Sequence, residues 1–344
     1  MGPRVGTPAA ALVPLWAAKL GDYVAAAEWS PDGALVAAGS LAGDGAIINA
    51  VSGIVEAPLT HHPMGILSLA WSADGRYLAT GGQDGVVRVR SRADGSEVVT
   101  GYTGWVACMA WSPTRPLLAV AVGREVHFID TAGDTVDVFT GQTSTVTTLA
   151  WSADGRLLGL GCYGGVSWFE PGGKREAVHR FDWKGSILTM TLSPDGEWLA
   201  AGNQDNSVHV WKLWSGEDME MVGYPAKVQH LSWDAGSRNL AVGNLEELMV
   251  WDFSGKGPVG TRPKSMEGVE RRISALRYQH GGPLLATGGA DGMLALWRPR
   301  KRNRMLCRTN TGSEISRLAW SKDDQFLLVS TAAGDVAVER LRTS

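Results

Sequence analysis

A period of about 40 residues, a bulky anchor side chain in each period and the lack of helical periodicity predict an all-β fold. We expect a single eight-bladed β-propeller, each blade a sheet of four short antiparallel strands. The anchors lie 40 to 45 residues apart, and they are Trp29, Trp71, Trp111, Trp151, Leu192, Trp233, Tyr278 and Trp320.

Every repeat has the same order of local signals. A first strand ends at the anchor, as in "SLAWSADG" around Trp71. An Asp-Gly turn follows in four of the eight copies, and Asp and Gly favour tight turns. A nearly continuous apolar strand comes next, such as "YLATGG" at 77–82, and then a third strand with alternating valines, such as "VVRV" at 86–89. A less regular fourth strand completes the unit.

The eighth repeat has three strands, and we expect the N-terminal segment to supply its fourth. The chain stops soon after Arg342, whereas "LVPLWAAKL" at 12–20 precedes the first repeat by the interval typical of a fourth strand. Pairing this segment with the C-terminal blade would remove two open sheet edges. The expected organisation is therefore an N-terminal tail at 1–11 and a propeller at 12–344. A secretory signal in the apolar run 9–18 is a weaker interpretation, because a proline interrupts the run.

Seven blades are the alternative. In that case one repeat would be an extension of its neighbour, and the weakest candidate is the repeat anchored by Tyr278, which follows a longer loop. The regular stretch "ATGGADGMLALW" in this same repeat favours eight.

Over roughly 12–341 the repeats resemble the WD40 family, although the namesake Trp-Asp pair occurs once, at Trp251–Asp252. The resemblance implies a hydrogen-bonded set of Asp, His, Ser or Thr, and Trp in each blade. The expected slots are occupied by His62, Thr80, Asp84 and Arg90 in the second blade, by Val269, Thr287, Asp291 and Trp297 in the seventh, and by Trp183, Ala201, Asp205 and Trp211 in the fifth. Because no blade keeps the full set, we expect stability to come mainly from apolar packing of the anchors.

No motif in the sequence predicts catalysis, a cofactor or a metal. Gly159, Gly161 and Gly164 have the G-x-G-x-x-G spacing of a dinucleotide site, but a strand, "VSWFE", follows them. Such a site requires a helix there, whose N-terminus holds the pyrophosphate. No P-loop, HExxH or CxxC is present. An enzyme or small-ligand binder using the central channel stays an alternative, which polar side chains converging in the channel would favour.

Net charge, hydropathy and cysteine content indicate the class of partner and the cellular compartment. A net charge of −3 and a pI near 6.2 make nucleic acid an unlikely partner. No run of 18 apolar residues predicts a membrane span. Cys108, Cys162 and Cys307 are far apart and odd in number, which favours a reducing, cytoplasmic location.

The sequence predicts a non-catalytic scaffold that binds proteins or peptides through the top face of the ring. We define the top face as the end where the second strand of a repeat turns into the third and the fourth leads into the next repeat. Aromatic residues and arginines dominate protein-binding hot spots. The candidates on these loops are Gln83, Trp105, Arg124, Tyr163, Trp183, Lys184, Gln204, Tyr224, Glu246, Arg271, Arg272 and Glu314.

Two further segments are candidates for partner binding. The segment "RPRKRNRMLCR", in the expected loop between the third and fourth strands of the seventh blade, predicts a basic patch that could dock an acidic partner or RNA. Its members are Arg298, Arg300, Lys301, Arg302, Arg304 and Arg308. The loop "SGKGPVGTRPK" at 254–264 is similar to loops of bacterial WD-repeat proteins, which implies, as an alternative, an accessory protein of a metal-handling GTPase.

Overall fold

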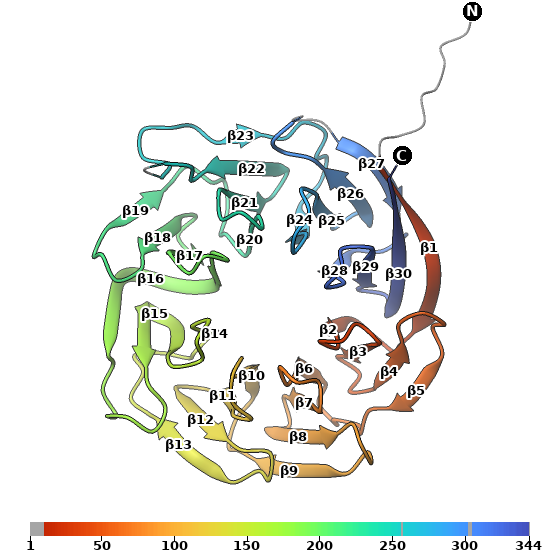
Figure 1. The fold of residues 1–344 in the computed structure, drawn as a ribbon, viewed down its shortest axis with the longest axis vertical. Coiled ribbons are helices and arrows are strands. Elements are labelled where there is room, and N and C mark those ends of the chain that lie inside the picture. Colours follow the sequence, from red (N-terminus) through yellow and green to blue (C-terminus); the bar gives the residue numbers. More distant parts are fainter. Residues whose placement is uncertain (1–9, 256, 302–304, 344) are drawn as a thin grey trace, which may run out of the picture.

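The computed structural model describes residues 10–255, 257–301 and 305–343, and these residues form thirty strands and no helix. The strands are arranged as a ring around an open centre, with the first and last strands side by side (Figure 1). The all-β propeller predicted from the repeats is thus confirmed.

The strands follow the repeats in chain order. The first three repeats form β2 (Val24–Trp29), β3 (Leu35–Ser40), β4 (Gly45–Asn49), β5 (Val55–Pro58), β6 (Ile66–Trp71), β7 (Tyr77–Gly82), β8 (Val86–Ser91), β9 (Glu97–Gly101), β10 (Val106–Trp111), β11 (Leu118–Val122), β12 (Glu125–Ile129) and β13 (Thr135–Phe139). The next two form β14 (Thr148–Trp151), β15 (Leu158–Phe169), β16 (His179–Leu192), β17 (Trp198–Asn203), β18 (Val208–Lys212) and β19 (Asp218–Met221). The last three, with the N-terminal strand, form β20 (His230–Trp233), β21 (Asn239–Asn244), β22 (Glu247–Asp252), β23 (Lys264–Ser265), β24 (Ile273–Tyr278), β25 (Leu285–Gly289), β26 (Met293–Trp297), β27 (Met305–Asn310), β28 (Ile315–Trp320), β29 (Phe326–Thr331), β30 (Asp335–Thr343) and β1 (Ala10–Lys19).

The expectation of eight separate blades is wrong when blades are counted as hydrogen-bonded sheets. The described strands form seven sheets, six of four strands and one of six, which is the number given by the alternative. The repeat of Tyr278 is not the cause, because it forms a complete sheet, β24 to β27. Instead, the fourth and fifth repeats share the six-stranded sheet β14 to β19. The long β15 and β16 pair with each other, and each also pairs with a strand of its own repeat.

The structure of the long strand β15 shows that its glycines do not form a dinucleotide site. The segment that contains Gly159, Gly161 and Gly164 lies within β15 and continues as strand to Phe169. No helix begins there, so the backbone N–H groups that a pyrophosphate would require are not presented. Gly165 has a positive φ of 119°, and a Cβ atom there would lie 2.0 Å from the carbonyl oxygen of Phe181. The glycines therefore serve the close approach of strands.

The ring closes by strand pairing between the two ends of the described chain. β1 pairs antiparallel with β30 from Ala10 opposite Thr343 to Lys19 opposite Asp335, with a register shift between Pro14 and Trp16. The predicted closing strand at 12–20 is confirmed, although it begins at Ala10 and ends at Lys19. The sheet that results has the order β1-β30-β29-β28.

The anchor tryptophans join neighbouring repeats by hydrogen bonds as well as by packing. The Trp111 indole N–H donates to the carbonyl of Ala70 at 3.0 Å, and the Trp151 indole N–H donates to the carbonyl of Ala110 at 3.0 Å. In each case the acceptor is the residue just before the preceding anchor. The same bond recurs for Trp29 to Ala319, Trp233 to Thr191 and Trp320 to Arg277. Each indole thus buries a large apolar area and satisfies its own N–H.

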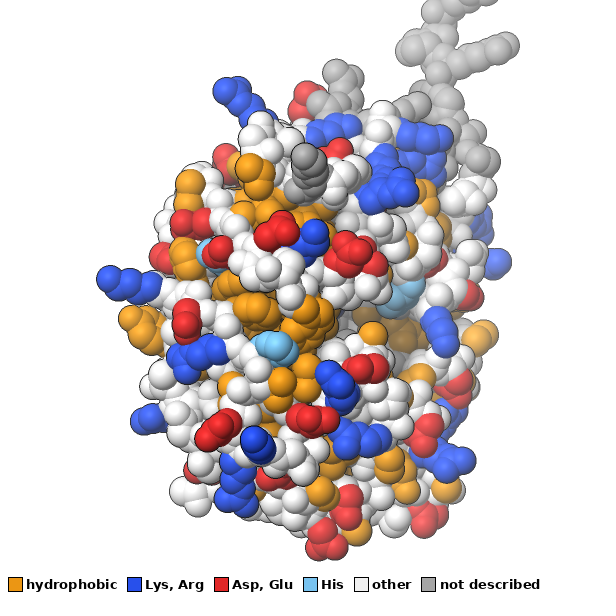
Figure 2. All heavy atoms as spheres, turned by 60° about the vertical axis from the view of Figure 1, so that its left-hand side comes forward, with side chains coloured by type: hydrophobic (Ala, Val, Ile, Leu, Met, Phe, Trp, Pro, Cys, Tyr) orange, Lys and Arg blue, Asp and Glu red, His pale blue; other side chains and the backbone are white. Residues whose placement is uncertain are grey.

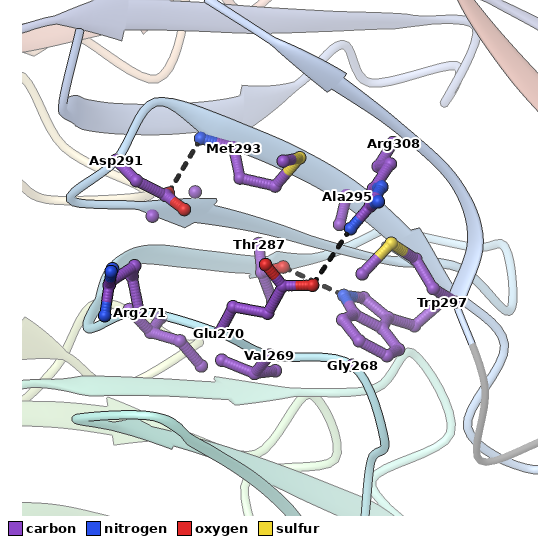
Figure 3. Close-up of a pocket in the computed structure, with 14 residues that line it drawn as sticks. Gly268, Val269, Glu270, Arg271, Thr287, Asp291, Met293, Ala295, Trp297 and Arg308 are labelled. Atoms are coloured by element: carbon purple, nitrogen blue, oxygen red, sulfur yellow. Dashed lines mark hydrogen bonds and ion pairs between the residues drawn. The ribbon is translucent and has the colours of Figure 1, made fainter.

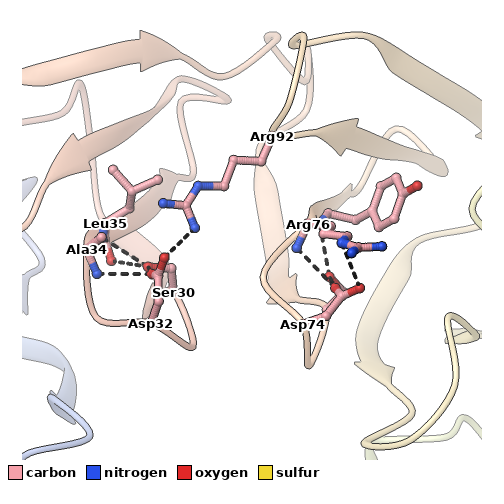
Figure 4. A network of polar contacts seen from close by, with 9 residues as sticks. Ser30, Asp32, Ala34, Leu35, Asp74, Arg76 and Arg92 are labelled. Atoms are coloured by element: carbon pink, nitrogen blue, oxygen red, sulfur yellow. Dashed lines mark hydrogen bonds and ion pairs between the residues drawn. The ribbon is translucent and has the colours of Figure 1, made fainter.

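The turn after five of the eight anchors is fixed by a Ser-x-Asp pair. The hydroxyl of Ser30 donates to Asp32 at 2.6 Å, and Asp32 in turn accepts from the backbone N–H of Ala34. The same pattern fixes Asp74 in the next repeat. Figure 4 shows Arg92 reaching across from the second repeat to Asp32, at 2.7 Å. The Asp-Gly recurrences therefore have a structural role, as predicted.

The joint between the fourth and fifth repeats carries a cluster of aromatic rings on the outer wall. Figure 2, which brings this side forward, shows apolar side chains gathered within a surface of mixed charge. Trp214 is half-exposed, and its ring centre lies 4.6 Å from His179 and 5.5 Å from Trp168. On the same sheet, Trp183 and His209 stack at 4.2 Å. Ring packing stabilises this joint where the hydrogen-bonded set of the family is incomplete.

Candidate functional site

The polar sets expected near the top face are incomplete in the way the sequence predicted. In the second repeat the two ring nitrogens of the buried His62 contact Asp84 at 3.1 Å and Thr80 at 2.9 Å, which confirms its structural role. Arg90, in the Trp slot, instead donates to Glu97 at 3.1 Å.

The seventh repeat has the complementary defect. The indole N–H of Trp297 donates to Thr287 at 2.8 Å, but Val269 stands where the His is expected. A cavity of about 20 Å³ lies among Val269, Thr287, Asp291 and Trp297 (Figure 3). This volume is that of about one water molecule. The cavity lies where the imidazole of the family's His would be, and it is too small for a ligand.

Four exposed apolar side chains lie along the top of the first four repeats, and we call them the apolar arc. Their exposed fractions are 38% for Leu41, 54% for Met64, 59% for Trp105 and 49% for Tyr163. Leu41 lies in the β3–β4 turn, Met64 in the β5–β6 loop, Trp105 in the β9–β10 loop and Tyr163 within β15. Trp105 and Tyr163 were predicted to be exposed, and this is confirmed.

Backbone contacts show that the loops of the apolar arc are continuous from repeat to repeat. A Cβ atom on Gly65 would lie 2.7 Å from the carbonyl oxygen of Leu41, and Gly65 accepts a hydrogen bond from the N–H of Gln83. A Cβ atom on Gly85 would lie 2.8 Å from the carbonyl oxygen of Gly104, next to Trp105.

The second half of the apolar arc is tied together in the same way. The Arg124 side chain donates to the carbonyl of Gln142 at 2.7 Å, and the backbone N–H of Tyr163 donates to Ser144 at 2.9 Å. Gln142 and Ser144 belong to one loop, which bridges the third and fourth repeats. The four apolar side chains therefore lie along one connected rim.

Ion pairs between neighbouring repeats occupy the top face on the opposite side of the ring. Arg272 pairs with Glu314 at 2.9 Å, and Arg271 approaches Glu246 at 4.0 Å. Because all four side chains are at least partly exposed, solvent screens these pairs and each contributes little to stability. This part of the top face also carries exposed apolar side chains, Val222 at 66% and Leu245 at 40%, so ion pairs and apolar groups are mixed here.

The remaining predicted top-face residues divide by exposure. Arg124, Lys184 and Gln204 are exposed, and Gln83 is half-buried. Trp183 is half-buried against His209, so it contributes chiefly to the blade. Tyr224, which occupies the His slot of its repeat, is likewise part of the blade. Its side chain is 5% exposed and its hydroxyl accepts the indole N–H of Trp251 at 2.8 Å, because it takes the place of the tetrad His.

The predicted basic patch is less uniform than its sequence indicates. Arg300 approaches Asp234 at 3.5 Å, and Arg308 lies on β27, not in the loop, where it pairs with Glu270 at 3.2 Å. Arg298 is half-buried and Lys301 is exposed. Arg302 and Arg304 lie outside the described residues. Carboxylates therefore neutralise part of this charge, and a role in partner binding stays a prediction.

The described residues show no arrangement typical of a metal centre. They contain no group of three or more His, Cys, Asp or Glu side chains that could hold a metal ion. Cys108, Cys162 and Cys307 form no disulfide. Burial raises the pKa of the Cys108 thiol to about 12, so this thiol stays protonated at neutral pH.

Comparison with known proteins assigns the repeats. The WD40 family (WD domain, G-beta repeat) matches residues 54–91, 133–166, 175–212 and 260–298. This chain contains WD40 repeats and folds as a β-propeller. The described residues include no helix long and apolar enough to cross a membrane.

Relatives of this WD40 propeller are similar over parts of their length. Protein FIZZY-RELATED 3 of Arabidopsis thaliana is 30% identical over 141 residues, which cover 39% of this chain and 28% of that protein. THO complex subunit 3 of the same plant is 26% identical over 174 residues, which cover 47% of this chain and 53% of that protein. The chain thus spans between about a quarter and half of these two curated relatives.

A solved structure is similar over nearly the whole chain. Sqt1 of Chaetomium thermophilum, bound to the N-terminus of the ribosomal protein L10, superimposes with a TM-score of 0.81 and 17% identity. The match covers 92% of this chain and 96% of that one. At this identity the likeness establishes the fold alone.

Leu41 and Met64 are the site residues that sequence reasoning missed. Both stand in short loops whose position in the period marks them as top-face loops, and that position is the signal that could have found them. They are aliphatic, whereas the search favoured aromatic and charged residues.

Proposed function

We propose that this propeller is a non-catalytic protein-interaction scaffold whose apolar arc binds a segment of a partner protein. The observation that carries the proposal is the row of four exposed apolar side chains on one connected rim, Leu41, Met64, Trp105 and Tyr163. Exposed apolar residues that gather on one face, unlike scattered ones, are typical of interaction surfaces.

The family supports the same function class. WD40 propellers typically serve as protein-interaction scaffolds, and the similar Sqt1 structure contains a bound protein segment. We infer that the partner of this chain contributes apolar side chains to the rim beside Trp105 and Tyr163. The exposed Arg124 between them can pair with a carboxylate of the partner. A cytoplasmic location belongs to the proposal, since the three cysteines are all free thiols.

The double variant Trp105→Ala, Tyr163→Ala tests the proposal. Truncating an aromatic side chain at a hot spot costs about 2 kcal/mol, so the pair should lower partner affinity by at least about tenfold. The measurement is affinity capture from the native organism with mass spectrometry, followed by titration of the partner that is found. The melting temperature of the variant should stay close to that of the unsubstituted protein, because both side chains are exposed.

The matched control is Val51→Ala, Ile54→Ala, which removes exposed apolar side chains from the opposite end of the ring, in the β4–β5 turn. This variant should retain the partner. If the folded top-face variant captures the same proteins with the same affinity as the control, the apolar arc is not the binding surface.

The predicted link to a metal-handling GTPase stays a prediction. Its loop, 254–264, connects β22 with the two-residue strand β23, away from the apolar arc.

A further inference from the structure

The central channel carries an uneven distribution of charge. The residue just before each anchor lies on an inner strand of the ring, and in most repeats it is Ala, Ser or Thr. Two repeats depart from this pattern, with Arg277 on β24 and Glu28 on β2. The repeat between them has Arg317 on β28, three residues before its anchor. Three charged side chains are thus gathered on three consecutive repeats.

These side chains extend from the inner strands into open space. Arg277 is exposed between the buried Leu276 and Tyr278, and Arg317 is exposed between two buried neighbours. Both line a cavity of about 390 Å³ at the inner surface of the ring. The cavity has the size of small-molecule sites. Its polar lining includes Thr189, Thr191, Gln229, His230, Arg277 and Arg317.

Neither of the two guanidinium groups in the channel contacts a carboxylate of the residues that the structure describes. Within the described part of the chain, the Arg277 side chain makes no hydrogen bond or ion pair. Arg317 has one hydrogen bond, to the backbone carbonyl of Ser316 at 3.0 Å. By contrast, Arg272 and Arg92 each contact a carboxylate within 3 Å. Glu28 acts electrostatically on both arginines but forms no ion pair with either of these described side chains. An anion bound between the two like charges would relieve their repulsion.

The other ionisable groups near the cavity leave its charge positive at neutral pH. Burial raises the pKa of Glu28 to about 7, although the backbone N–H of Trp71 and the charges of Arg277 and Arg317 act in the opposite direction. Because Glu28 is nonetheless exposed to the water of the channel, it can ionise, and even then two arginines and one carboxylate leave one net positive charge. Burial, helped by the charges of Arg317 and Arg272, lowers the pKa of His230 to about 4, so its imidazole is neutral and can still form a hydrogen bond.

We propose that the channel is a binding site for a small oxyanion of the phosphate type, held between Arg277 and Arg317. The planar guanidinium group matches the oxygens of such an anion and stays charged at all relevant pH values. His230, Thr189 and Thr191 line the same cavity and supply neutral hydrogen-bonding groups. This site is separate from the apolar arc, and neither proposal depends on the other.

Isothermal titration calorimetry with sulfate tests the site, because sulfate keeps its charge between pH 6 and 8. At constant ionic strength set with chloride, we expect saturable binding of one sulfate. Arg277→Gln and Arg317→Gln should each weaken it by about tenfold or more, since each removes one charge-assisted contact. The control Arg156→Gln, an exposed turn arginine outside the channel, should change the affinity by less than about twofold.

Thermal unfolding of each variant shows that it is folded before binding is compared. Sulfate that binds no better than chloride would overturn the proposal. An affinity that is unchanged in the folded Arg277→Gln, Arg317→Gln double variant would overturn it as well.

The pH dependence of sulfate binding gives a second test. Glu28 faces Arg317 from β28 and Arg277 from β24, while the adjacent β3, β6 and β29 carry no ionisable side chain. As the pH rises from 6 to 8, ionisation of Glu28 should cancel part of the positive charge and weaken binding. Glu28→Gln should remove most of this change. An equally strong pH dependence in the variant would show that Glu28 does not control the site.

The ligand is either a free anion or the phosphate of a larger metabolite. Inorganic phosphate and glycerol 2-phosphate, compared at pH 7, distinguish the two sources. Equal affinity for both indicates a site for the free oxyanion, and tighter binding of the ester indicates a larger phosphorylated ligand. Failure of both to compete with sulfate would overturn the assignment to phosphate-type anions.

Discussion

At the scale of residues, the blades differ in which members of the family's polar set they contain. The second repeat has the His but not the Trp, and the seventh has the Trp but not the His. His62 shows what the missing group does, since it links an acidic turn residue to a strand hydroxyl from a fully buried position. Such a buried bridge satisfies polar atoms that would otherwise be costly to bury.

Val269→His should complete the set in the seventh repeat. The new imidazole would fill the cavity beside Thr287 and Asp291, and we expect a gain of about 1 kcal/mol in the free energy of unfolding, the usual net value of one hydrogen bond. Denaturant unfolding measures the change. Val269→Leu fills similar space without hydrogen bonds, so it should give no comparable gain. Destabilisation by Val269→His would show that the slot is not a vacant imidazole site.

Asp32 should make the protein sensitive to acid. Burial opposes the shift, but hydrogen bonds from Ser30, Arg92 and the backbone N–H of Ala34 lower the pKa of Asp32 to about 2, from an ordinary value of 3.8. The folded state therefore binds fewer protons than the unfolded state between these two values. The stability that Asp32 contributes is present above pH 4 and is lost as the pH falls from 4 to 2.

Melting temperatures of Asp32→Asn measured between pH 5 and 2 test this dependence. The variant should be less stable than the unsubstituted protein at pH 5 and should lose less stability on acidification. Arg92→Gln, which removes one of the three donors, should show part of the same effect. Parallel curves for all three proteins would contradict the expectation.

At the scale of elements, inner strands of neighbouring repeats are linked through the anchors. The indole N–H of an anchor reaches the carbonyl before the preceding anchor in five of the described repeats. Trp71 is an exception, because its indole N–H is buried without a hydrogen-bond partner. Trp71 and Trp111 are thus equally buried anchors, and of these two only Trp111 forms the indole hydrogen bond.

Trp111→Phe and Trp71→Phe form a matched pair. Both variants keep an aromatic ring in a site that is 7% exposed, but Trp111→Phe alone removes a hydrogen bond, to Ala70. We expect Trp111→Phe to cost about 1 kcal/mol more than Trp71→Phe in the free energy of unfolding. Equal costs in urea titrations would mean that the indole bonds add nothing to packing.

Elements were predictable from the sequence where one local signal determines them. The anchors, the Asp-Gly turns and the closing strand at 12–20 follow from spacing and turn chemistry, and all are present. The joined sheet of the fourth and fifth repeats was not predictable, because it depends on how far β15 and β16 extend their pairing. The His slot indicated a structural role for Tyr224, but the period could not identify its partner, the indole of Trp251, which is 27 residues away.

At the scale of the whole molecule, folding into a ring places residues that alternate along the sequence on two separate surfaces, the top face and the central channel. The top face carries the apolar arc on the first four repeats and ion pairs on the last three, and the channel brings together Glu28, Arg277 and Arg317. The period located the loops, yet it could not show which inner-strand side chains meet across the channel. Charges separated by more than 200 residues become neighbours because the ring closes.

Closure by β1 is therefore the central claim, and removal of residues 1–19 tests it most directly. The deletion exposes the edge of β30 along the whole register from Asp335 to Thr343, so we expect the melting temperature to fall by about 5 °C or more. A synthetic peptide of residues 10–19 added in excess should bind and restore part of the loss, because it can pair with the same edge. An unchanged melting temperature after the deletion, with no effect of the peptide, would contradict closure of the ring by this strand.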